Sequence, residues 1–322
     1  MPLLLTNEDV RASIAMTDAI AAMEEAFVEQ GNGHVVQPQR LNIKAGKGWL
    51  RLGPAILERS GWMGFKAMNL CPGVGLRYVI LLYTIKDGAL VAIIDAQHLT
   101  TARTGATSAV ATRYLARAEP TTVGVIGSGA EARAQLEAMH ALGLATRARV
   151  YSRDAANRER FAADMASRLG IDIVPCANGR EAVDNCGIVV AAVRSSEIAL
   201  KGEWLQPGMH VNSVGTARPG QREIDPATFS RSAIVVVDTR EGVFTEAGDA
   251  LAAKEVISAT EACELADVVV GRAPRRTDSS QITLFKSVGT AVQDVGLAAR
   301  AFTMAVQRGI GTELGAFPYL KS

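Results

Sequence analysis

A glycine-rich segment carries the clearest chemistry in this sequence. Residues 123–132 read Val-Gly-Val-Ile-Gly-Ser-Gly-Ala-Glu-Ala, an apolar run that leads into G-x-G-x-x-A. In this pattern Gly127 permits a tight turn, Gly129 lets a phosphate approach the backbone, and Ala132 lets a helix pack closely on a strand. Free N–H groups at the start of that helix attract phosphate, although a plain strand-to-helix turn is the alternative. The segment predicts a dinucleotide site formed by Gly127, Ser128, Gly129, Ala130, Glu131 and Ala132.

The residues after the next predicted strand, 149–151, bear on which dinucleotide binds. Ser152 and Arg153 offer a hydroxyl and a guanidinium, which suit the 2′-phosphate of NADP. Asp154 could instead accept a hydrogen bond from the 2′-hydroxyl of NAD, and Arg153 could be an ordinary surface charge. We therefore expect NADP, with NAD as the alternative.

The elements around this segment alternate between strands and helices. Continuous Val/Ile runs indicate parallel strands that are covered on both faces. Val193, where the run 187–193 ends, is assigned to the cofactor site. The expected fold class is α/β, with a Rossmann-type doubly wound parallel sheet. Strands are predicted over 123–126, 149–151, 172–174, 187–193, 210–214 and 233–237, and helices over 131–142, 157–169 and 180–184.

The remainder of the chain has a different pattern. Apolar residues at helical spacing over 7–30 indicate a helix or a pair of helices, and Gly-bounded runs over 34–95 indicate a mainly antiparallel sheet. Ala-rich helices are predicted over 102–115 and 289–307, the second long enough to return to the first domain. We expect a first domain of residues 1–117 with 303–322, and a Rossmann domain of residues 118–302.

Composition narrows the function classes. The chain has 322 residues, with 34 Lys and Arg against 33 Asp and Glu, so a strongly basic nucleic-acid face is not expected. No leader or spanning segment is recognised at the start, so we expect a cytoplasmic protein without a membrane partner. The four cysteines and four histidines show no ligand spacing, and no metal site is predicted.

Several blocks together resemble the ornithine cyclodeaminase/mu-crystallin family over nearly the whole length. They are Pro38-Gln39-Arg40, Phe65-Lys66, residues 102–109 (Ala-Arg-Thr-Gly-Ala-Thr-Ser-Ala), the glycine-rich segment and residues 285–289 (Phe-Lys-Ser-Val-Gly). The resemblance implies a Rossmann domain beside a discontinuous α+β domain for substrate binding and dimerisation, and hence a homodimer. Members include cyclodeaminases, an archaeal type of alanine dehydrogenase and reductases of cyclic ketimines.

The resemblance also implies site residues. The family meets its substrate carboxylate with cations, which match Arg40, Lys66 and Arg103 here. A guanidinium grips a carboxylate with two hydrogen bonds, and a lysine adds a movable charge and a proton donor. Lys66 could instead be an edge-strand lysine, and Arg103 could contact the pyrophosphate. Thr104, Ser287 and Gly289 are assigned to the cofactor, although Gly289 could simply begin a helix.

One departure decides between activities. Cyclodeaminase-like and alanine-dehydrogenase-like members tend to carry Gly-x-Asp where this chain has Gly215-Thr216-Ala217. Ketimine-reductase-like members also lack that acid, so its absence favours hydride delivery to an imine over deamination. Glu246 matches an acidic family position and could favour an iminium, or be a loop carboxylate. An exposed Arg77 on a strand is favoured over a substrate contact.

The sequence thus predicts an NAD(P)H-dependent reductase of small, cyclic α-imino acids such as pyrroline-2-carboxylate or piperideine-2-carboxylate, acting on C=N bonds to yield L-amino acids. The first alternative is a cyclodeaminase or alanine-dehydrogenase-type enzyme that acts on an α-amino acid. The second is a catalytically silent, crystallin-like protein that only binds NADP.

Overall fold

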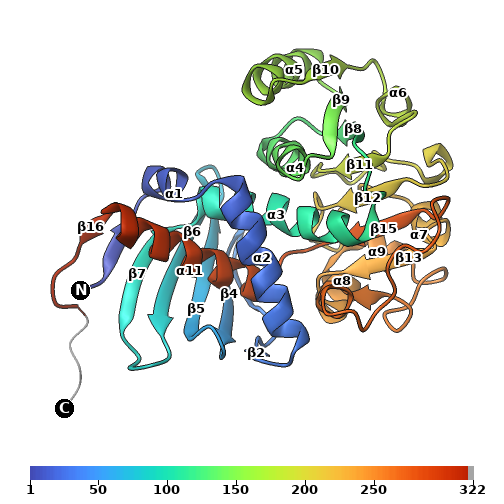
Figure 1. The fold of residues 1–322 in the computed structure, drawn as a ribbon. Coiled ribbons are helices and arrows are strands. Elements are labelled where there is room, and N and C mark those ends of the chain that lie inside the picture. Colours follow the sequence, from blue (N-terminus) through green and yellow to red (C-terminus); the bar gives the residue numbers. More distant parts are fainter. Residues whose placement is uncertain (318–322) are drawn as a thin grey trace. The chain divides into compact units, whose positions relative to one another are not determined.

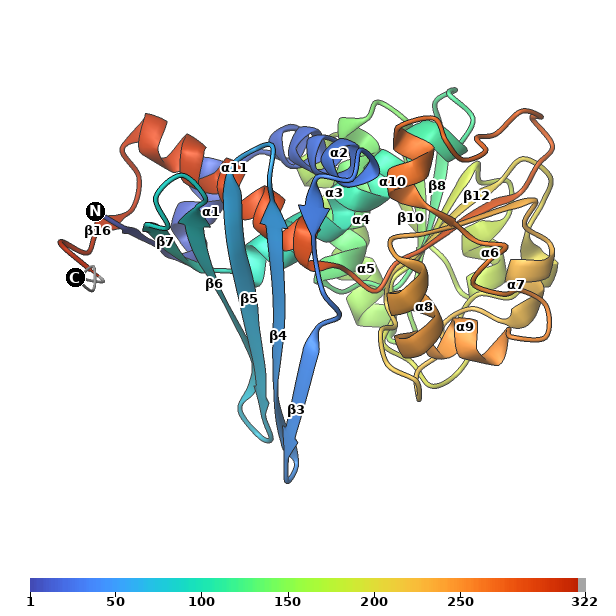
Figure 2. The same cartoon turned by 90° about the horizontal axis from the view of Figure 1, so that it is seen from below.

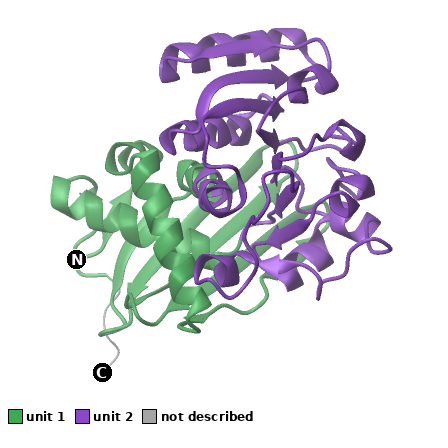
Figure 3. Ribbon diagram, turned by 45° about the vertical axis from the view of Figure 1, so that its right-hand side comes forward, with its two compact units in different colours: residues 1–103, 290–322 green, residues 104–289 purple. Residues whose placement is uncertain are grey.

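The computed structural model describes residues 1–317, and the chain forms two compact units (Figure 3). Unit 1 comprises residues 1–103 and 290 onward, and unit 2 comprises residues 104–289. These bounds differ from the predicted domains, which divided the chain at 117/118 and returned at 303. The reason is α11 (Ala291–Arg308), an unbroken helix that packs on α2 (Met16–Gly31) and therefore belongs to unit 1 from its start. Residues 318–322, included in the predicted first domain, lie outside the described residues.

Unit 1 contains an eight-stranded sheet in the order β16-β1-β7-β6-β5-β4-β2, with β3 paired to β4. The sheet is antiparallel except where β1 pairs with β7, which confirms the mainly antiparallel prediction. Figure 2 shows β3 and β4 as a long hairpin. The strands are β1 (Leu3–Leu5), β2 (Val35–Val36), β3 (Leu41–Ala45), β4 (Gly48–Leu57), β5 (Trp62–Cys71), β6 (Gly75–Thr84), β7 (Leu90–Asp95) and β16 (Thr312–Glu313).

One face of this sheet is covered by helices. The predicted helix or helix pair over 7–30 is a pair, α1 (Asn7–Ser13) and α2. Thr6 begins α1 with a capping box, in which its hydroxyl accepts from the Asp9 N–H at 3.2 Å. Figure 1 shows α11 crossing the strands, and α11 contacts β4, β5, β6 and α2. A Cβ added at Gly296 would lie 3.1 Å from the Ala26 Cβ, so glycine allows α11 and α2 to approach closely.

Unit 2 contains an eight-stranded sheet in the order β10-β9-β8-β11-β12-β15-β13-β14, and every pairing in it is parallel. This confirms the predicted α/β class. The strands are β8 (Thr121–Ile126), β9 (Ala145–Tyr151), β10 (Asp172–Pro175), β11 (Ile188–Ala191), β12 (His210–Ser213), β13 (Ile234–Val237), β14 (Cys263–Glu264) and β15 (Thr283–Lys286). Strand β15 was not predicted, because its apolar run is short and ends at Lys286, a residue type that rarely ends a buried strand.

One helix precedes these strands, and the other helices connect them. α3 (Gln97–Leu115) begins five residues before the predicted residue 102, where Asp95 accepts from the Gln97 N–H at 3.0 Å. The others are α4 (Ala130–Ala141), α5 (Ala155–Leu169), α6 (Gly179–Val183), α7 (Pro226–Ser230), α8 (Arg240–Glu246), α9 (Gly248–Ala252) and α10 (Leu265–Val269), with a 3-10 turn over Gly202–Trp204. Within residues 1–317, none of the helices has the length and apolar character needed to cross a membrane.

The strand order places a reversal between β8 and β11. From β8 the chain proceeds outward through β9 and β10, and it then returns to β11 on the other side of β8. In open parallel sheets the carboxyl ends of the strands at such a reversal form the ligand crevice. A ligand is therefore expected at the segments after β8 and β11.

Candidate functional site

The glycine-rich loop after β8 is closely fitted to the segment after β11. Gly127 has a φ of +120°, and a Cβ there would lie 2.6 Å from the Ala192 carbonyl oxygen. Glycine is therefore required at residue 127. Gly129, by contrast, caps the start of α4 with nothing within 4 Å of its Cβ position. The open helix start and the close loop packing suit a pyrophosphate at this edge.

The other predicted residues of this loop occupy the positions that the motif requires. Ser128 and Glu131 are half-buried, Ala130 is exposed in the first turn of α4, and Ala132 is fully buried. Thr104 is linked to the same helix, because its carbonyl accepts from Gln135 Nε2 of α4 at 3.1 Å. A Cβ at the neighbouring Gly105 would lie 2.6 Å from the Ala134 carbonyl oxygen, so α3 is seated tightly on α4.

The end of β9 presents two guanidinium groups. Arg153 is exposed, and the carboxylate of Asp154 accepts from the Asn157 N–H at 2.8 Å as the cap of α5. Ser152 Oγ donates to the Asp154 carbonyl at 3.1 Å. Arg158, which the sequence prediction missed, donates to the Ser152 carbonyl at 3.1 Å. Its spacing of one helical turn after the Asp154 cap is the signal that could have found it.

The segments after β11 and β12 are joined by one carboxylate. Glu223 accepts from the Val193 N–H at 2.9 Å with one oxygen and from the Gly215 N–H at 2.8 Å with the other. A Cβ at Gly215 would overlap the Val193 backbone nitrogen, so the two segments touch. Val193 therefore lies at the predicted edge, with its own N–H bonded to Glu223.

A fully buried lysine lies beneath these segments. Lys286 Nζ is 2.6 Å from Asp249 Oδ2 and 3.5 Å from Glu223 Oε1, and none of the three side chains is exposed. It also donates to the hydroxyls of Ser213 and Thr216, each at 2.9 Å. Burial raises the pKa of Glu223 to about 7, against the opposing charge of Lys286. The sequence prediction missed Glu223 and Asp249, although a lysine at the end of an apolar run signals a buried partner.

The predicted residues after β15 are held by another missed acid. Asp238 accepts from Ser287 Oγ at 2.7 Å, from the Gly289 N–H at 2.6 Å and from the Val288 N–H at 3.1 Å. Gly289 has a φ of +80° and does not begin the helix, because α11 starts at Ala291. The segments after β8, β9, β11, β12, β13 and β15 thus share one edge of the parallel sheet.

Unit 1 gathers the three predicted cations. Lys66 Nζ lies 2.7 Å from Asp294 Oδ2, and Arg103 Nε lies 3.0 Å from Asp294 Oδ1. Arg103 also donates to Gln293 Oε1 at 2.9 Å. Lys66 is 8% exposed, Arg103 7% and Asp294 4%, so this is a buried charge cluster. Asp294 and Gln293 of α11 were missed, because nothing local in the sequence indicates which strand a distant helix will meet.

Arg40 belongs to the same cluster. Gly53 of β4 pairs with Lys66 of β5, and a Cβ at Gly53 would lie 4.0 Å from the Arg40 Cβ. Burial lowers the pKa of Lys66 to about 8; Asp294 opposes this, while Arg103 and Arg40 add to it. Lys66 and Arg103 contact Asp294, and Arg40 lies near Lys66, so the cluster has more cations than anions and suits a small carboxylate ligand.

Glu246 ends α8 in unit 2 and is half-buried. It lies next to the segment that contains Ala217, because the Gly248 N–H donates to the Arg218 carbonyl at 3.2 Å. Arg77 is exposed and pairs with Asn69, on the face of the unit 1 sheet opposite to Lys66.

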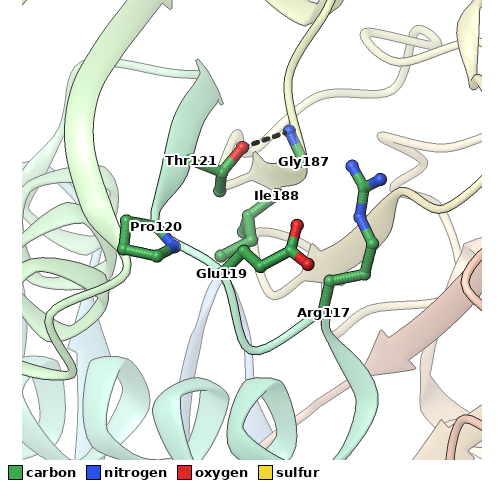
Figure 4. Close-up of a pocket in the computed structure, with 6 residues that line it drawn as sticks. All are labelled: Arg117, Glu119, Pro120, Thr121, Gly187 and Ile188. Carbon is green, nitrogen blue, oxygen red and sulfur yellow. Dashed lines mark hydrogen bonds between the residues drawn. The ribbon is translucent and has the colours of Figure 1, made fainter.

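A pocket at the other edge of the unit 2 sheet is separate from these residues (Figure 4). It lies where β8 and β11 begin, and the Gly187 N–H donates to Thr121 Oγ1 there at 3.0 Å. The opposite charges of Arg117 and Glu119 line it. Since the crevice segments follow the carboxyl ends of the same strands, this pocket is not part of the candidate site.

Comparisons with known proteins agree with this architecture. The Δ1-pyrroline-2-carboxylate reductase of Thermococcus litoralis, solved with NADH and L-proline, is 37% identical, with a TM-score of 0.92 over 97% of this chain and 100% of that one. An archaeal alanine dehydrogenase dimer with bound NAD is 30% identical, with a TM-score of 0.91 over 98% and 99%. The ketimine reductase mu-crystallin of Mus musculus is 30% identical over 91% of this chain and 94% of its own.

These relatives are reductases and dehydrogenases, as the predicted oxidoreductase class requires. The model of the ornithine cyclodeaminase/mu-crystallin family matches residues 1–307. The predicted resemblance is thereby confirmed: the chain belongs to the ornithine cyclodeaminase/mu-crystallin family.

Proposed function

We propose that this chain is an NAD(P)H-dependent reductase of small α-imino acids, with cyclic ketimines such as pyrroline-2-carboxylate and piperideine-2-carboxylate as substrates. The observation that carries the proposal is the cation cluster formed by the buried Lys66 and Arg103 and the half-buried Arg40. If the substrate has one carboxylate beside a C=N bond, Arg40 and Arg103 can bind the carboxylate and Lys66 can protonate the imine nitrogen. The related pyrroline-2-carboxylate reductase and ketimine reductase support the same substrate class.

In this proposal the residues of unit 1 bind and protonate. Arg40 and Arg103 hold the substrate carboxylate, and Lys66 donates a proton to the imine nitrogen. The reduced nicotinamide, when bound, supplies a hydride to the imine carbon. One N–H bond of Lys66 breaks and one N–H bond of the product forms, after which Lys66 regains a proton from water. Glu246 is proposed to favour the charged imine.

The burial and pairing of the acidic residues in unit 2 support reduction over deamination. Deamination needs a carboxylate that reaches the substrate, and Ala217 stands where related deaminating enzymes are expected to carry one. The nearby Glu223 and Asp249 have no exposed surface and pair with Lys286. Neither is available as a relocated acid.

NADP is the proposed dinucleotide. The exposed guanidinium of Arg153 and the neighbouring Arg158 offer two cations to a 2′-phosphate. The carboxylate of Asp154 already caps α5, which leaves it less free to accept from a 2′-hydroxyl. The relatives solved with NADH and NAD keep NAD as the alternative.

A second copy of this chain is the proposed partner of unit 1. Gly53 and Leu57 of β4 face α11. Because side chains alternate along a strand, the even-numbered residues of β4 face away from the helices. Strand pairing places six exposed apolar residues on that uncovered face: Val36, Leu41, Ile43, Leu50, Ile56 and Val79, each 37–54% exposed. An apolar face of this kind marks a protein interface, and the related alanine dehydrogenase is a dimer.

The test of the function is a matrix of imines and nucleotides. Oxidation of NADPH and of NADH is followed with pyrroline-2-carboxylate, piperideine-2-carboxylate and an acyclic imino acid, for the wild type and for Lys66→Ala. We expect turnover of at least one cyclic imine and a loss of about 10²–10⁴-fold in the variant, the usual contribution of a general acid. Equal rates for the two proteins would remove Lys66 from the mechanism.

The archaeal alanine dehydrogenase relative keeps an oxidative deamination as the second candidate. Reduction of NAD⁺ by L-alanine, or ammonia release from L-ornithine without net nucleotide turnover, would favour it. Micromolar NADPH binding without turnover of any imine or amino acid would instead identify a protein that only binds the nucleotide.

A further inference from the structure

One carboxylate stands among the cations that the proposed reduction uses. Asp294 contacts both Lys66, at 2.7 Å, and Arg103, at 3.0 Å. An acid inside an anion-binding cluster weakens the attraction for a substrate carboxylate, and burying it costs free energy unless it is well paired. Its presence at 4% exposure therefore calls for a function that a cation set alone would not provide.

The groups around Lys66 show what Asp294 changes. Arg103 of α3 and Arg40, before β3, are both close enough to disfavour the Lys66 ammonium. The Tyr78 ring of β6 has its centroid 5.9 Å from Nζ, and Thr100 Oγ1 of α3 accepts from Nζ at 3.4 Å. Burial also favours the neutral amine. Among these neighbours Asp294 is the one anion, so it favours the charged lysine more strongly than the Tyr78 ring or the Thr100 hydroxyl does.

Asp294 and its neighbour also fix the direction of Arg103. Arg103 donates from Nε to Asp294 and from Nη1 to Gln293, at 3.0 and 2.9 Å. Two consecutive residues of α11 thus hold one guanidinium, which restricts it to a single orientation. A charge-removing substitution of Asp294 by asparagine leaves the Gln293 bond in place.

We propose that Asp294 is a positioning residue of this reductase: its carboxylate keeps Lys66 protonated and fixes Lys66 and Arg103 at one point. The inference rests on the proposed function, in which Lys66 gives its proton to the imine nitrogen. Asp294 itself exchanges no proton in that step. It acts through Lys66, and it sets the pH range in which Lys66 has a proton to give.

The first experiment measures the protonation of the Lys66 amine in the absence of catalytic turnover. Trace acetylation with acetic anhydride across a pH series, followed by peptide mass spectrometry, reports the midpoint at which Lys66 becomes reactive. The exposed Lys47 serves as the internal standard. In Asp294→Asn the midpoint is expected to fall by about 1–3 pH units, the usual effect of an adjacent opposite charge. An unchanged midpoint would overturn the proposal.

Two further variants separate the effect of the Asp294 charge from a general loss of stability. Asp294→Glu keeps the carboxylate, so its midpoint should return towards that of the wild type; a midpoint equal to that of Asp294→Asn would contradict the proposal. Glu29→Gln is the matched control, because Glu29 is a buried acid of unit 1 that accepts from the Arg59 N–H at 2.7 Å. It should reduce stability without moving the Lys66 midpoint.

Activity measurements then distinguish the inference about Asp294 from the proposed reductase function. In Asp294→Asn the alkaline limb of kcat/KM for the active imine should move to lower pH by the same amount as the acetylation midpoint. A shifted midpoint in a protein that reduces no imine refutes the proposed function while leaving the Lys66–Asp294 relationship intact. A wild type that reduces imines, with equal midpoints in both proteins, refutes the inference alone.

Discussion

Lys286 Nζ lies 2.6 Å from Asp249 Oδ2 at a point where neither side chain has any exposed surface. Together with Glu223, this pair fixes the backbone of the segments after β11 and β12 from below. A buried charge set of this kind is strongly destabilised when one partner is removed, because the remaining charges stay buried without compensation.

Replacing Lys286 is therefore expected to be costly for folding. Lys286→Met should lower the free energy of unfolding by about 3–5 kcal/mol, measured by urea unfolding. Adding Asp249→Asn and Glu223→Gln to that variant should restore part of the loss, since the uncompensated acids are then neutral. A triple variant no more stable than the single one would contradict this account.

The pH dependence of stability tests a second buried group. His210 bonds to Thr283 Oγ1 at 2.9 Å and to Asn212 Oδ1 at 3.2 Å, and burial lowers its pKa to about 3. Between about pH 6.5 and pH 3 the unfolded chain therefore binds a proton that the folded chain does not. Stability should fall as pH decreases through this window, by at most about 1.4 kcal/mol per pH unit.

The comparison that isolates this effect is between the wild type and His210→Gln. Glu223 has a raised pKa and titrates in the opposite sense, so the difference between the two unfolding profiles is the informative quantity. The difference in free energy of unfolding between the wild type and His210→Gln should decrease as the pH falls from about 7 to about 5.

The two glycines of the loop after β8 should respond differently to alanine. At Gly127 a methyl group would meet the Ala192 carbonyl at 2.6 Å and a φ of +120°, so Gly127→Ala should both destabilise the fold, by about 1–3 kcal/mol, and abolish nucleotide binding. Gly129→Ala meets no atom within 4 Å. It should leave stability nearly unchanged and weaken NADPH binding, measured by fluorescence titration. Equal loss of stability in both would count against the assigned packing.

Nucleotide preference is tested at the end of β9. Arg153→Ala should lower kcat/KM for NADPH by about 10–100-fold, with little change for NADH, because a charge-assisted contact to the 2′-phosphate is worth about 1.5–3 kcal/mol. Arg160→Ala, at an exposed arginine of α5, is the control. Parallel losses for both nucleotides would indicate that Arg153 does not read the 2′-phosphate.

The oligomeric state is tested on the uncovered face of the unit 1 sheet. Two negative charges introduced there, in Leu50→Glu with Val79→Glu, should convert the proposed dimer into a monomer, observed by light scattering at micromolar concentration. Val306→Glu changes an apolar residue of α11 that is 55% exposed and should leave the dimer intact. A wild type that is already monomeric would refute the proposal.

The sequence predicted those parts of the site that depend on local pattern. Gly127, Gly129 and Ala132 lie in the strand–turn–helix that their spacing requires, because a steric requirement is written into consecutive residues. The blocks of the family resemblance pointed to Lys66 and Arg103, which the structure brings together through Asp294.

The carboxylates that hold these residues could not be predicted in the same way. Asp294 and Asp238 bond to residues far away in the chain, such as Arg103, 191 positions from Asp294, and Ser287, 49 positions from Asp238. Glu223 bonds to the nearby Gly215 and also to Val193, 30 positions away. Their roles depend on which strands and helices meet, and a single sequence contains no local pattern that specifies this. Strand β15 escaped prediction for a local reason, since its apolar run is short and ends at Lys286.

The position of β15 has a consequence for synthesis on the ribosome. Strands β12 and β13 each pair with β15, so both have an open edge until residue 286 has emerged. The sheet of unit 1 likewise lacks its covering helix until α11 is complete at Arg308. Neither sheet can be completed before these late segments are available, and a nascent chain stalled before about residue 280 would expose apolar strand edges that invite aggregation.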